Sequence, residues 1–309
     1  MELRQRIAER RGGIVLFGMT PPRQGTPAES VRQVAERTMQ RLEPVDVDAL
    51  VLYDIDDESD RNPAERPFPY SATLDPADFA EQLEGWKKPV VIYRCVGKYT
   101  SEHLGQWLGS QDPERVMTVF VGASSRDKEV AVSLPEAQTL RQEVQPDLLL
   151  GGVAIPERHL ARGDEQARLL AKQSAGVSFF VTQVVYDVNA AKDLLSDYHY
   201  ACRDAGVEPV PLVFTLSVCG SLKTLEFLEW LGVNVPRWVQ NDLRHSADTL
   251  KQSYDQCVAT AEELIAFADR LQVPIGFNVE SVAIRKAEIE ASVELAGHIR
   301  KRLEEYRDF

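Results

Sequence analysis

The chain has 309 residues, of which 44% are hydrophobic and 27% charged, a balance that is typical of a globular protein and excludes a largely disordered chain. Its 35 basic and 48 acidic residues give a net charge of −13, which argues against nucleic acid or an anionic membrane as the main partner. No stretch approaches the roughly 18 apolar residues of a transmembrane helix, and the N-terminal segment lacks the apolar core of a secretory signal. The four cysteines are widely spaced, so we expect reduced thiols in a cytoplasmic protein.

Short β-rich apolar runs alternate with helical patterns along the whole chain. Most of these runs are continuously apolar, which indicates strands that are buried on both faces. We predict eight strands between about residue 13 and residue 280, at Gly13–Met19, Val47–Asp54, Pro89–Val96, Arg115–Gly122, Asp147–Ala154, Val177–Val184, Glu208–Thr215 and Pro274–Glu280.

The segments between the runs have helical periodicity and helix start signals, such as Pro27 and Asp75 just before two of them. The predicted helices are Glu29–Leu42, Pro76–Gly85, Ser101–Leu108, Pro135–Val144, Gly163–Ser174, Asn189–Ala205, Ser221–Leu231, Ser246–Leu271 and a C-terminal helix at 283–306.

Eight strands that alternate with helices predict an α/β protein with a single (β/α)8 TIM barrel, which spans residues 1–309 as one domain. A doubly wound open sheet is the competing architecture, but no GxGxxG pattern follows the first strand. In a barrel of this kind the active site lies at the carboxyl ends of the strands, so the residues that end each predicted strand are the candidates for function.

Four motifs at these strand ends carry a resemblance to a known family. They are FGMTPPR (Phe17–Arg23), IPERH (Ile155–His159), VTQVVYD (Val181–Asp187) and VNVPRW (Val233–Trp238). In order and spacing they resemble the methylenetetrahydrofolate reductases, from about residue 13 to residue 277. The resemblance implies FAD laid across the barrel, reduced by NADH or NADPH, and a hydride passed to methylenetetrahydrofolate.

The resemblance also implies roles for individual residues. Gln183 is similar to a glutamine that contacts substrate, and Tyr186 of the same motif is assigned to the substrate as well. The residues assigned to the flavin cofactor are Tyr53, Gly122, His159 and Lys172. We further expect His159 to pair with Glu157, and Arg94 and Lys98 to meet a phosphate or the glutamyl tail of a folate.

The departures from the family pattern are concentrated at the same strand ends. The family's catalytic glutamate falls at Gly18, its aspartate after the fourth strand falls at Ala123, and a histidine near the flavin falls at Tyr93. These losses predict a changed function or cofactor. The contacts to FAD are eroded, which favours direct hydride transfer from the nicotinamide over transfer through a flavin, and both stay open.

Two other acids are candidates to replace the missing glutamate. Glu280 ends the eighth predicted strand, and Asp54 follows the second within an acidic loop that includes Asp56 and Glu58. A carboxylate is a suitable partner for the amino and N3–H donors of a pterin. A group that takes over the acid role should have a raised pKa in a desolvated site. The acidic loop lacks the glycine of a calcium loop, so we expect no metal.

These observations favour a methylenetetrahydrofolate reductase-like oxidoreductase of one-carbon metabolism, with hydride transfer through FAD or directly. Two alternatives stay open: a non-redox folate- or pterin-binding protein or one-carbon enzyme on the same barrel, and a silent homologue that acts through a partner. The expected ligand is a folate or related pterin, and the sequence leaves the oligomeric state open.

Overall fold

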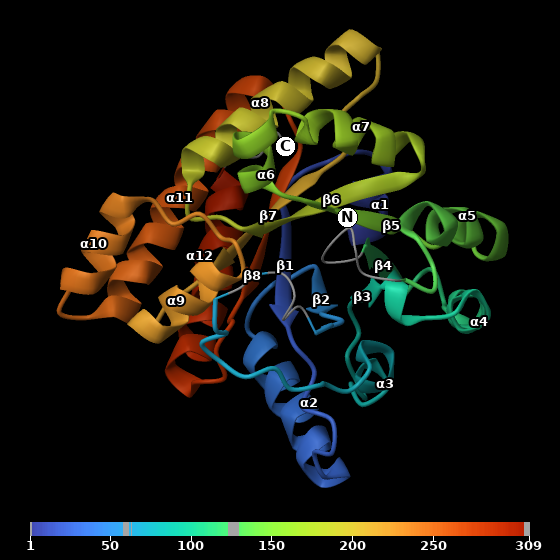
Figure 1. Cartoon of the computed structure of the whole chain (residues 1–309), viewed down its shortest axis with the longest axis horizontal. Coiled ribbons are helices and arrows are strands. Elements are labelled where there is room, and N and C mark those ends of the chain that lie inside the picture. The colour runs from blue at the N-terminus through green and yellow to red at the C-terminus, as the bar shows by residue number, and fades with distance from the viewer. Residues whose placement is uncertain (1, 58–61, 63, 123–129, 306–309) are drawn as a thin grey trace.

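The structure is a computed structural model, and it describes residues 2–57, 62, 64–122 and 130–305. Its strands are parallel and pair in chain order, and β8 pairs with β1, so the sheet closes on itself (Figure 1). This closed barrel confirms the predicted (β/α)8 fold over an open sheet. The strands are β1 (Ile14–Met19), β2 (Ala49–Leu52), β3 (Val90–Cys95), β4 (Val116–Val121), β5 (Leu150–Ala154), β6 (Val177–Val184), β7 (Leu212–Ser217) and β8 (Ile275–Glu280).

Helices cover the outside of the barrel (Figure 1). Three of them, α1, α6 and α10, have no counterpart among the helices predicted from sequence. The helices are α1 (Leu3–Ala8), α2 (Ala28–Leu42), α3 (Pro76–Ala80), the 3-10 turn η1 (Val96–Lys98), α4 (Ser101–Ser110), α5 (Leu134–Val144), α6 (Pro156–Arg162), α7 (Glu165–Ser174), α8 (Val188–Ala205), α9 (Leu222–Trp230), α10 (Arg237–His245), α11 (Thr249–Leu271) and α12 (Lys286–Glu305).

Some element boundaries differ from the predicted ones for local reasons. Strand β7 begins at Leu212 rather than at Glu208, because Pro209 and Pro211 lack the N–H that a sheet ladder needs. Helix α11 begins at Thr249 rather than at Ser246, because the Asp248 side chain accepts a hydrogen bond from the Lys251 N–H and caps the helix there.

Alternate strand residues fill the inside of the barrel. Gly151 leaves room for the ring of Phe179, since a Cβ at that position would lie 2.6 Å from Phe179 Cζ. Leu3 and Ile7 of α1 join the same cluster, so α1 closes the end of the barrel where the strands begin. The strand residues of this cluster are Ile14, Leu16, Ala49, Val51, Val91, Tyr93, Met117, Val119, Phe179, Val181 and Val213.

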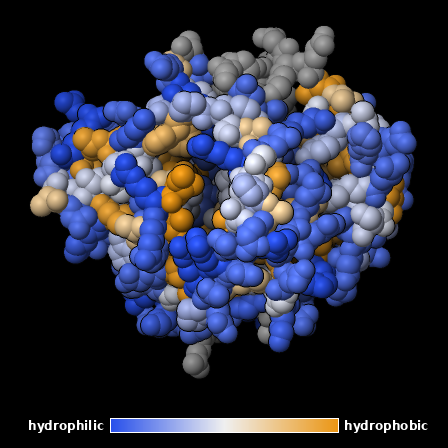
Figure 2. Space-filling model, turned by 90° about the horizontal axis from the view of Figure 1, so that it is seen from below, coloured by the Kyte–Doolittle hydropathy of each residue, from blue (hydrophilic) through white to orange (hydrophobic). Residues whose placement is uncertain are grey.

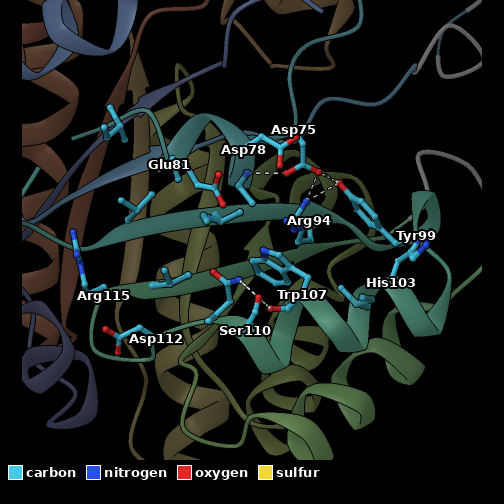
Figure 3. A pocket seen from close by; sticks show the side chains of 18 of the residues that line it. Asp75, Asp78, Glu81, Arg94, Tyr99, His103, Trp107, Ser110, Asp112 and Arg115 are labelled. Atoms are coloured by element: carbon cyan, nitrogen blue, oxygen red, sulfur yellow. Dashed lines mark hydrogen bonds and ion pairs between the residues drawn. The ribbon is translucent and has the colours of Figure 1, made fainter. Parts of the chain in front are cut away.

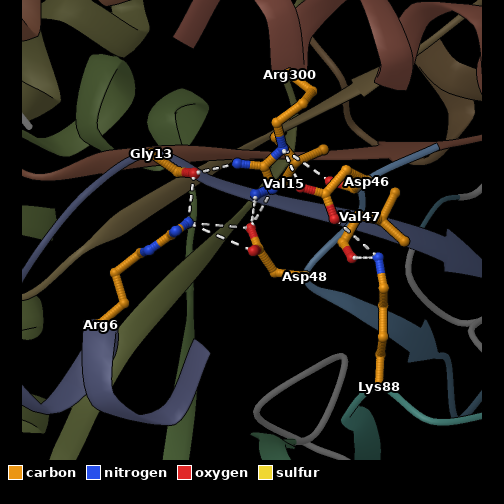
Figure 4. A network of polar contacts seen from close by, with 8 residues as sticks. All are labelled: Arg6, Gly13, Val15, Asp46, Val47, Asp48, Lys88 and Arg300. Atoms are coloured by element: carbon orange, nitrogen blue, oxygen red, sulfur yellow. Dashed lines mark hydrogen bonds and ion pairs between the residues drawn. The ribbon is translucent and has the colours of Figure 1, made fainter. Parts of the chain in front are cut away.

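A polar network joins four elements at this closed end (Figure 4). Asp48, just before β2, accepts a 2.7 Å hydrogen bond from the Val15 N–H of β1. Its carboxylate pairs with Arg300 of α12 at 2.5 Å and with Arg6 of α1 at 3.4 Å. Both arginines also donate to the Gly13 carbonyl. The network therefore ties α1 and α12 to the first two strands.

The hydrophilic surface agrees with the charged composition of the sequence. The face in Figure 2 is predominantly hydrophilic, and apolar residues appear on it as separate small patches. Within the described ranges, no helix combines the length and the apolar character that crossing a membrane requires. The cytoplasmic location stays a prediction.

Candidate functional site

The carboxyl ends of β1, β2, β7 and β8 bring several polar side chains together at the barrel mouth. Strand register places Glu280, the last residue of β8, between Gly18 of β1 and Ser217 of β7. Asn278 lies two residues earlier on β8, so its side chain points to the same face of the strand. Glu280 thus stands on the strand next to the position where the resemblance places the missing glutamate.

Tyr53 fills the space that a side chain at position 18 would need. A Cβ added to Gly18 would lie 2.9 Å from Tyr53 Oη, 3.0 Å from Tyr53 Cε2 and 3.2 Å from Asn278 Oδ1. The Tyr53 ring also packs edge-on against Tyr93, with 4.8 Å between the centroids. The glycine is therefore part of how this mouth is packed, because the aromatic ring depends on the absent side chain.

Hydrogen bonds connect these residues across the mouth. Asn278 donates from Nδ2 to Tyr53 Oη at 2.7 Å and to Thr215 Oγ1 at 3.3 Å. Both Tyr53 and Asn278 also lie close enough to the carboxyl group of Glu280 to lower its pKa. We call Tyr53, Asn278 and Glu280 the mouth triad.

The environment of Glu280 favours its protonated form. Burial raises the pKa of this carboxyl to about 7, although the side chains of Tyr53 and Asn278 act in the opposite direction. Burial and the nearby charge of Glu280 hold the pKa of Tyr53 well above its ordinary value. Tyr53 therefore stays a neutral donor, and Glu280 can hold or release a proton near neutral pH.

Two buried polar atoms at the mouth have no hydrogen-bond partner in the described part of the chain. They are Asn278 Oδ1 and Ser217 Oγ, and both residues are fully buried. Unpaired buried polar atoms are uncommon in folded proteins, because each loses its bonds to water without replacement. Both atoms belong to the same strand ends as the half-buried Glu280 and are closed off from solvent.

Gln183 lies at the end of β6, where a register shift interrupts the pairing with β7. Its Oε1 accepts from the Val184 N–H at 3.0 Å, and its Nε2 reaches the carbonyl of Leu231 at 3.5 Å. The second bond is at the limit of hydrogen-bond length, so the amide is only weakly held. Gln183 is thus half-buried at a strand end and retains donor capacity for a ligand.

Asp54, the second candidate acid, lies in a separate network. Its carboxylate accepts from Lys98 Nζ at 2.6 Å, from the Cys95 N–H at 2.8 Å and from Tyr99 Oη at 2.8 Å. These three bonds fasten the end of β2 to the turn after β3. The arrangement gives Asp54 and Lys98 an anchoring role and leaves Glu280 as the acid of the mouth triad.

Tyr186 lies in the helical layer rather than in the mouth, which corrects its assignment to the substrate. It is 2% exposed, and its hydroxyl donates to the Ser217 carbonyl at 2.8 Å and contacts Ser253 Oγ of α11 at 3.0 Å. The chain turns outward after the last residue of β6, so the ring packs between β7 and α11.

Arg94 also points away from the mouth, because it alternates with the inward-facing Tyr93 on β3. It lines an outer groove of about 720 Å³ between α3 and α4 (Figure 3). There it pairs with Asp75 at 2.6 Å, donates to Tyr99 and stacks 4.1 Å from the Trp107 ring. The expected contact of Arg94 with a folate tail at the mouth is therefore not supported by its position.

The residues assigned to the flavin do not form a common set. Lys172 donates to the Val153 carbonyl at 2.5 Å, and burial lowers its pKa. His159 is buried and pairs with Asp197 of α8 at 3.1 Å, rather than with Glu157 as expected. Tyr53 belongs to the mouth triad, and Gly122 follows β4 at the barrel rim. Lys172 is thus held by the Val153 carbonyl and one ring nitrogen of His159 by Asp197, and we derive no step through a flavin.

Several predicted positions lie outside the described residues. They are Ala123, where the family's second acid is replaced, and Glu58 of the acidic loop. Among the residues that are described, no group of three or more His, Cys, Asp or Glu side chains is arranged to hold a metal ion.

Sequence reasoning did not single out Asn278, Ser217 or Thr215. All three lie near predicted strand ends. The alternation of side chains along a strand could have shown that they face the inside of the barrel. Val213, Thr215 and Ser217 share the inward face of β7, and a polar residue inside a barrel is the exception that needs a reason.

Comparisons with known proteins identify a family and a similar solved structure. The methylenetetrahydrofolate reductase family profile matches residues 121–269. A solved structure of a protein from Clostridium thermocellum is 41% identical, with a TM-score of 0.85 over 97% of this chain and 99% of that one. It is described as an uncharacterized protein that binds two copies of 5-methyl-5,6,7,8-tetrahydrofolic acid.

More distant matches add nothing on function. A xylanase of glycoside hydrolase family 10 from a sugarcane soil metagenome is 14% identical over 90% of this chain and 88% of its own, with a TM-score of 0.47. A 2,3-dimethylmalate lyase is 13% identical over 99% of this chain and 97% of its own, with a TM-score of 0.45. No curated protein matches the sequence.

The fold and the mouth define a TIM-barrel protein with an acid at the carboxyl end of its last strand. Together with the family match and the 41% identity over nearly the whole length, they show that the chain belongs to the methylenetetrahydrofolate reductase family. The resemblance places Gly18 at the position of the family's catalytic glutamate, so we interpret the chain as a divergent member.

Proposed function

We propose that this protein binds a reduced folate of the 5-methyltetrahydrofolate type, with the pterin ring in the barrel mouth. The observation that carries the proposal is the mouth triad, in which Glu280 is half-buried beside Gly18 and has a pKa raised to about 7. The Clostridium thermocellum relative, which binds 5-methyltetrahydrofolic acid, supports the same ligand class.

The chemistry of the mouth suits a pterin. The ring presents an amino group and N–H donors on one edge, and a carboxylate can accept two of them in a fork. Glu280 is the acceptor for this edge, and Asn278 Oδ1 is a second, otherwise unpaired acceptor beside it. The Gln183 amide can donate and accept, so it completes the recognition from β6.

Calorimetric titration with 5-methyltetrahydrofolate tests this proposal. We expect Glu280→Gln to weaken binding about tenfold, because glutamine keeps the shape and loses one acceptor, and Gln183→Ala to weaken it by about 1–3 kcal/mol. The matched control is Glu102→Gln on the exposed face of α4, which should leave the affinity unchanged. Equal affinity in wild type and both mouth variants would contradict the assignment of the ligand to the mouth.

A second candidate function is the reductase reaction, in which NADH or NADPH reduces methylenetetrahydrofolate to methyltetrahydrofolate. The raised pKa of Glu280 favours it, because a general acid works best when its pKa is near the working pH. Protonated Glu280 would give its proton to the folate and open the methylene bridge to the iminium. A hydride from the nicotinamide would then add to the methylene carbon.

An assay of NADH or NADPH oxidation distinguishes folate binding alone from the reductase reaction. It is carried out with methylenetetrahydrofolate, with and without added FAD. The reductase predicts oxidation that falls as the pH rises above about 7 and that is lost in Glu280→Gln. Folate binding without nicotinamide oxidation supports the non-redox reading. The visible absorption of the purified protein after FAD addition tests whether a flavin takes part.

A further inference from the structure

Two cations at α9 lack acidic partners among the described residues. Arg66, in the segment after β2, and Lys223, on α9, form neither an ion pair nor a hydrogen bond with any residue the structure describes. The guanidinium Nε of Arg66 is buried without a hydrogen-bond partner. In a chain with 48 acidic and 35 basic residues, unpaired cations are positions where an anionic ligand gains most.

Aromatic rings hold both cations in place. The Arg66 Cζ atom lies 5.6, 5.3 and 5.1 Å from the ring centroids of Tyr70, Phe227 and Trp230. The Lys223 Nζ atom lies 4.8 Å from the centroid of Phe68. Such contacts orient a cation and leave its N–H groups free for an acceptor. We call these four rings the aromatic rim.

The aromatic rim is a fixed part of the fold. Trp230 Nε1 donates to the Ala64 carbonyl at 2.9 Å, and Asn62 Nδ2 donates to the Trp230 carbonyl at 3.3 Å. Phe68 packs edge-on against Phe227 at 5.3 Å. The segment after β2 therefore rests on α9, as its course in Figure 1 also shows.

The aromatic rim is continuous with the mouth. Gln183 reaches the carbonyl of Leu231, which directly follows Trp230 of the rim. The residue that Gln183 contacts thus directly follows α9, the helix that carries Lys223, Phe227 and Trp230. Arg94, the cation that sequence reasoning assigned to a folate tail, points into the outer groove instead.

We propose that Arg66 and Lys223 bind the carboxylates of the glutamate tail of the folate, with the p-aminobenzoyl ring against the aromatic rim. This inference rests on the proposed folate-binding function and deepens it. The glutamate of a folate carries two carboxylates, which match the two cations in number and charge. The rim thereby selects folates that carry the tail over free pterins.

Binding of two ligands tests this inference: 5-methyltetrahydrofolate, and a tetrahydropterin with the same ring system and no p-aminobenzoylglutamate. We expect the wild type to bind the tailed ligand at least about tenfold more tightly. In the double variant Arg66→Gln/Lys223→Gln, the affinity for the tailed ligand should fall to nearly that for the tetrahydropterin, which itself should not change.

Further variants separate binding from folding. Lys223 is exposed, so Lys223→Gln alone should keep the fold and lose part of the preference, while Arg66→Lys should keep most of it. The matched control is Arg270→Gln, since Arg270 lies 4.8 Å from the Phe267 ring at the far end of α11 and should have no effect.

The outcomes distinguish the two proposals. A double variant that keeps the wild-type preference for the tail overturns the role of Arg66 and Lys223 and leaves folate binding intact. Equal binding of the two ligands by the wild type also overturns the role of Arg66 and Lys223 and leaves folate binding intact. Absence of binding for both ligands overturns the folate-binding function, and this inference with it.

Discussion

Position 18 and position 280 lie side by side on neighbouring strands. The strand end that would carry the family's glutamate holds Gly18, and the neighbouring strand end holds Glu280 in direct register with it. Tyr53 takes the volume released at Gly18 and connects the two positions through its hydroxyl. Acid function can therefore persist at this mouth although the catalytic position of the family is empty.

The raised pKa of Glu280 predicts a pH dependence of stability. The carboxyl titrates near 7 in the folded protein and near its ordinary value of 4.5 when unfolded, so the folded state binds the proton more tightly. The contribution of this group to the free energy of unfolding is fully present below about pH 4.5. It is lost as the pH rises through about 7, by up to about 3 kcal/mol. Urea unfolding at about pH 5 and about pH 7.5 should show a smaller loss for Glu280→Gln than for wild type.

Glu288 is also a buried acid with a raised pKa, so the wild type alone does not isolate Glu280. The difference between wild type and Glu280→Gln in the stability lost between the two pH values isolates the contribution of Glu280. If both lose the same stability between the two pH values, Glu280 titrates normally in the folded protein.

Gly18→Ala should destabilise the protein by about 1–3 kcal/mol, because the added methyl group would lie within 3.0 Å of the Tyr53 ring. Thermal or urea unfolding measures this. The control is Gly297→Ala on α12, where the nearest atom is 4.0 Å away and alanine should be neutral or stabilising. A stable Gly18→Ala variant would show that Tyr53 moves aside, and Gly18→Glu could then be tested for recovered reductase activity.

At the scale of elements, the motif at the end of β6 has two functions. Gln183 lies on the strand at the mouth, and Tyr186, three residues later, fixes the chain to α11 through Ser253. A motif that reads as one unit in the sequence is thus divided between ligand and core. The division follows from the turn between strand and helix, which reverses the direction of the side chains.

Tyr186→Phe separates the two functions. Loss of the hydroxyl should lower the free energy of unfolding by about 1–2 kcal/mol, because the Ser217 carbonyl and Ser253 lose a buried partner. The affinity for 5-methyltetrahydrofolate should not change. Tyr200→Phe on the exposed face of α8 is the control for stability. Weaker folate binding with unchanged stability would return Tyr186 to the substrate site.

At the scale of the whole molecule, the two ends of the barrel have different tasks. The mouth contains unpaired acceptors and an acid near its titration point, whereas the closed end contains the saturated network around Asp48. The network supports the barrel at the end where the strands begin, so we expect residues at the opposite end to tolerate change without loss of the fold.

Asp48→Ala should destabilise the protein by about 3–5 kcal/mol, because Arg300, Arg6 and the Val15 N–H lose their shared partner in a largely buried network. The control, Asp46→Ala, removes a carboxylate with 74% side-chain exposure and should cost less than about 1 kcal/mol. Urea unfolding of both variants measures the difference. Equal losses would show that the network around Asp48 contributes no more than a surface ion pair.

The sequence by itself determined the fold and the family. Continuous apolar runs that alternate with helical periodicity required a parallel sheet covered by helices, and four motifs in register identified the family. Glu280 was also accessible from sequence, because strand ends in a barrel converge on one mouth. Helix α1 was not, since its stabilisation comes from Leu3 and Ile7 inside the barrel rather than from its own sequence pattern.

Only the tertiary structure decided which polar residues meet. Arg94 and Tyr186 lie near strand ends in the sequence, but side-chain direction takes them away from the mouth. Gly18 and Tyr53 are complementary only because neighbouring strands place the Tyr53 ring within about 3 Å of where a Cβ at position 18 would lie, a relation that no local pattern records. The physical reason is that strand register and side-chain alternation, which determine what faces the mouth, are set by the closure of the whole barrel.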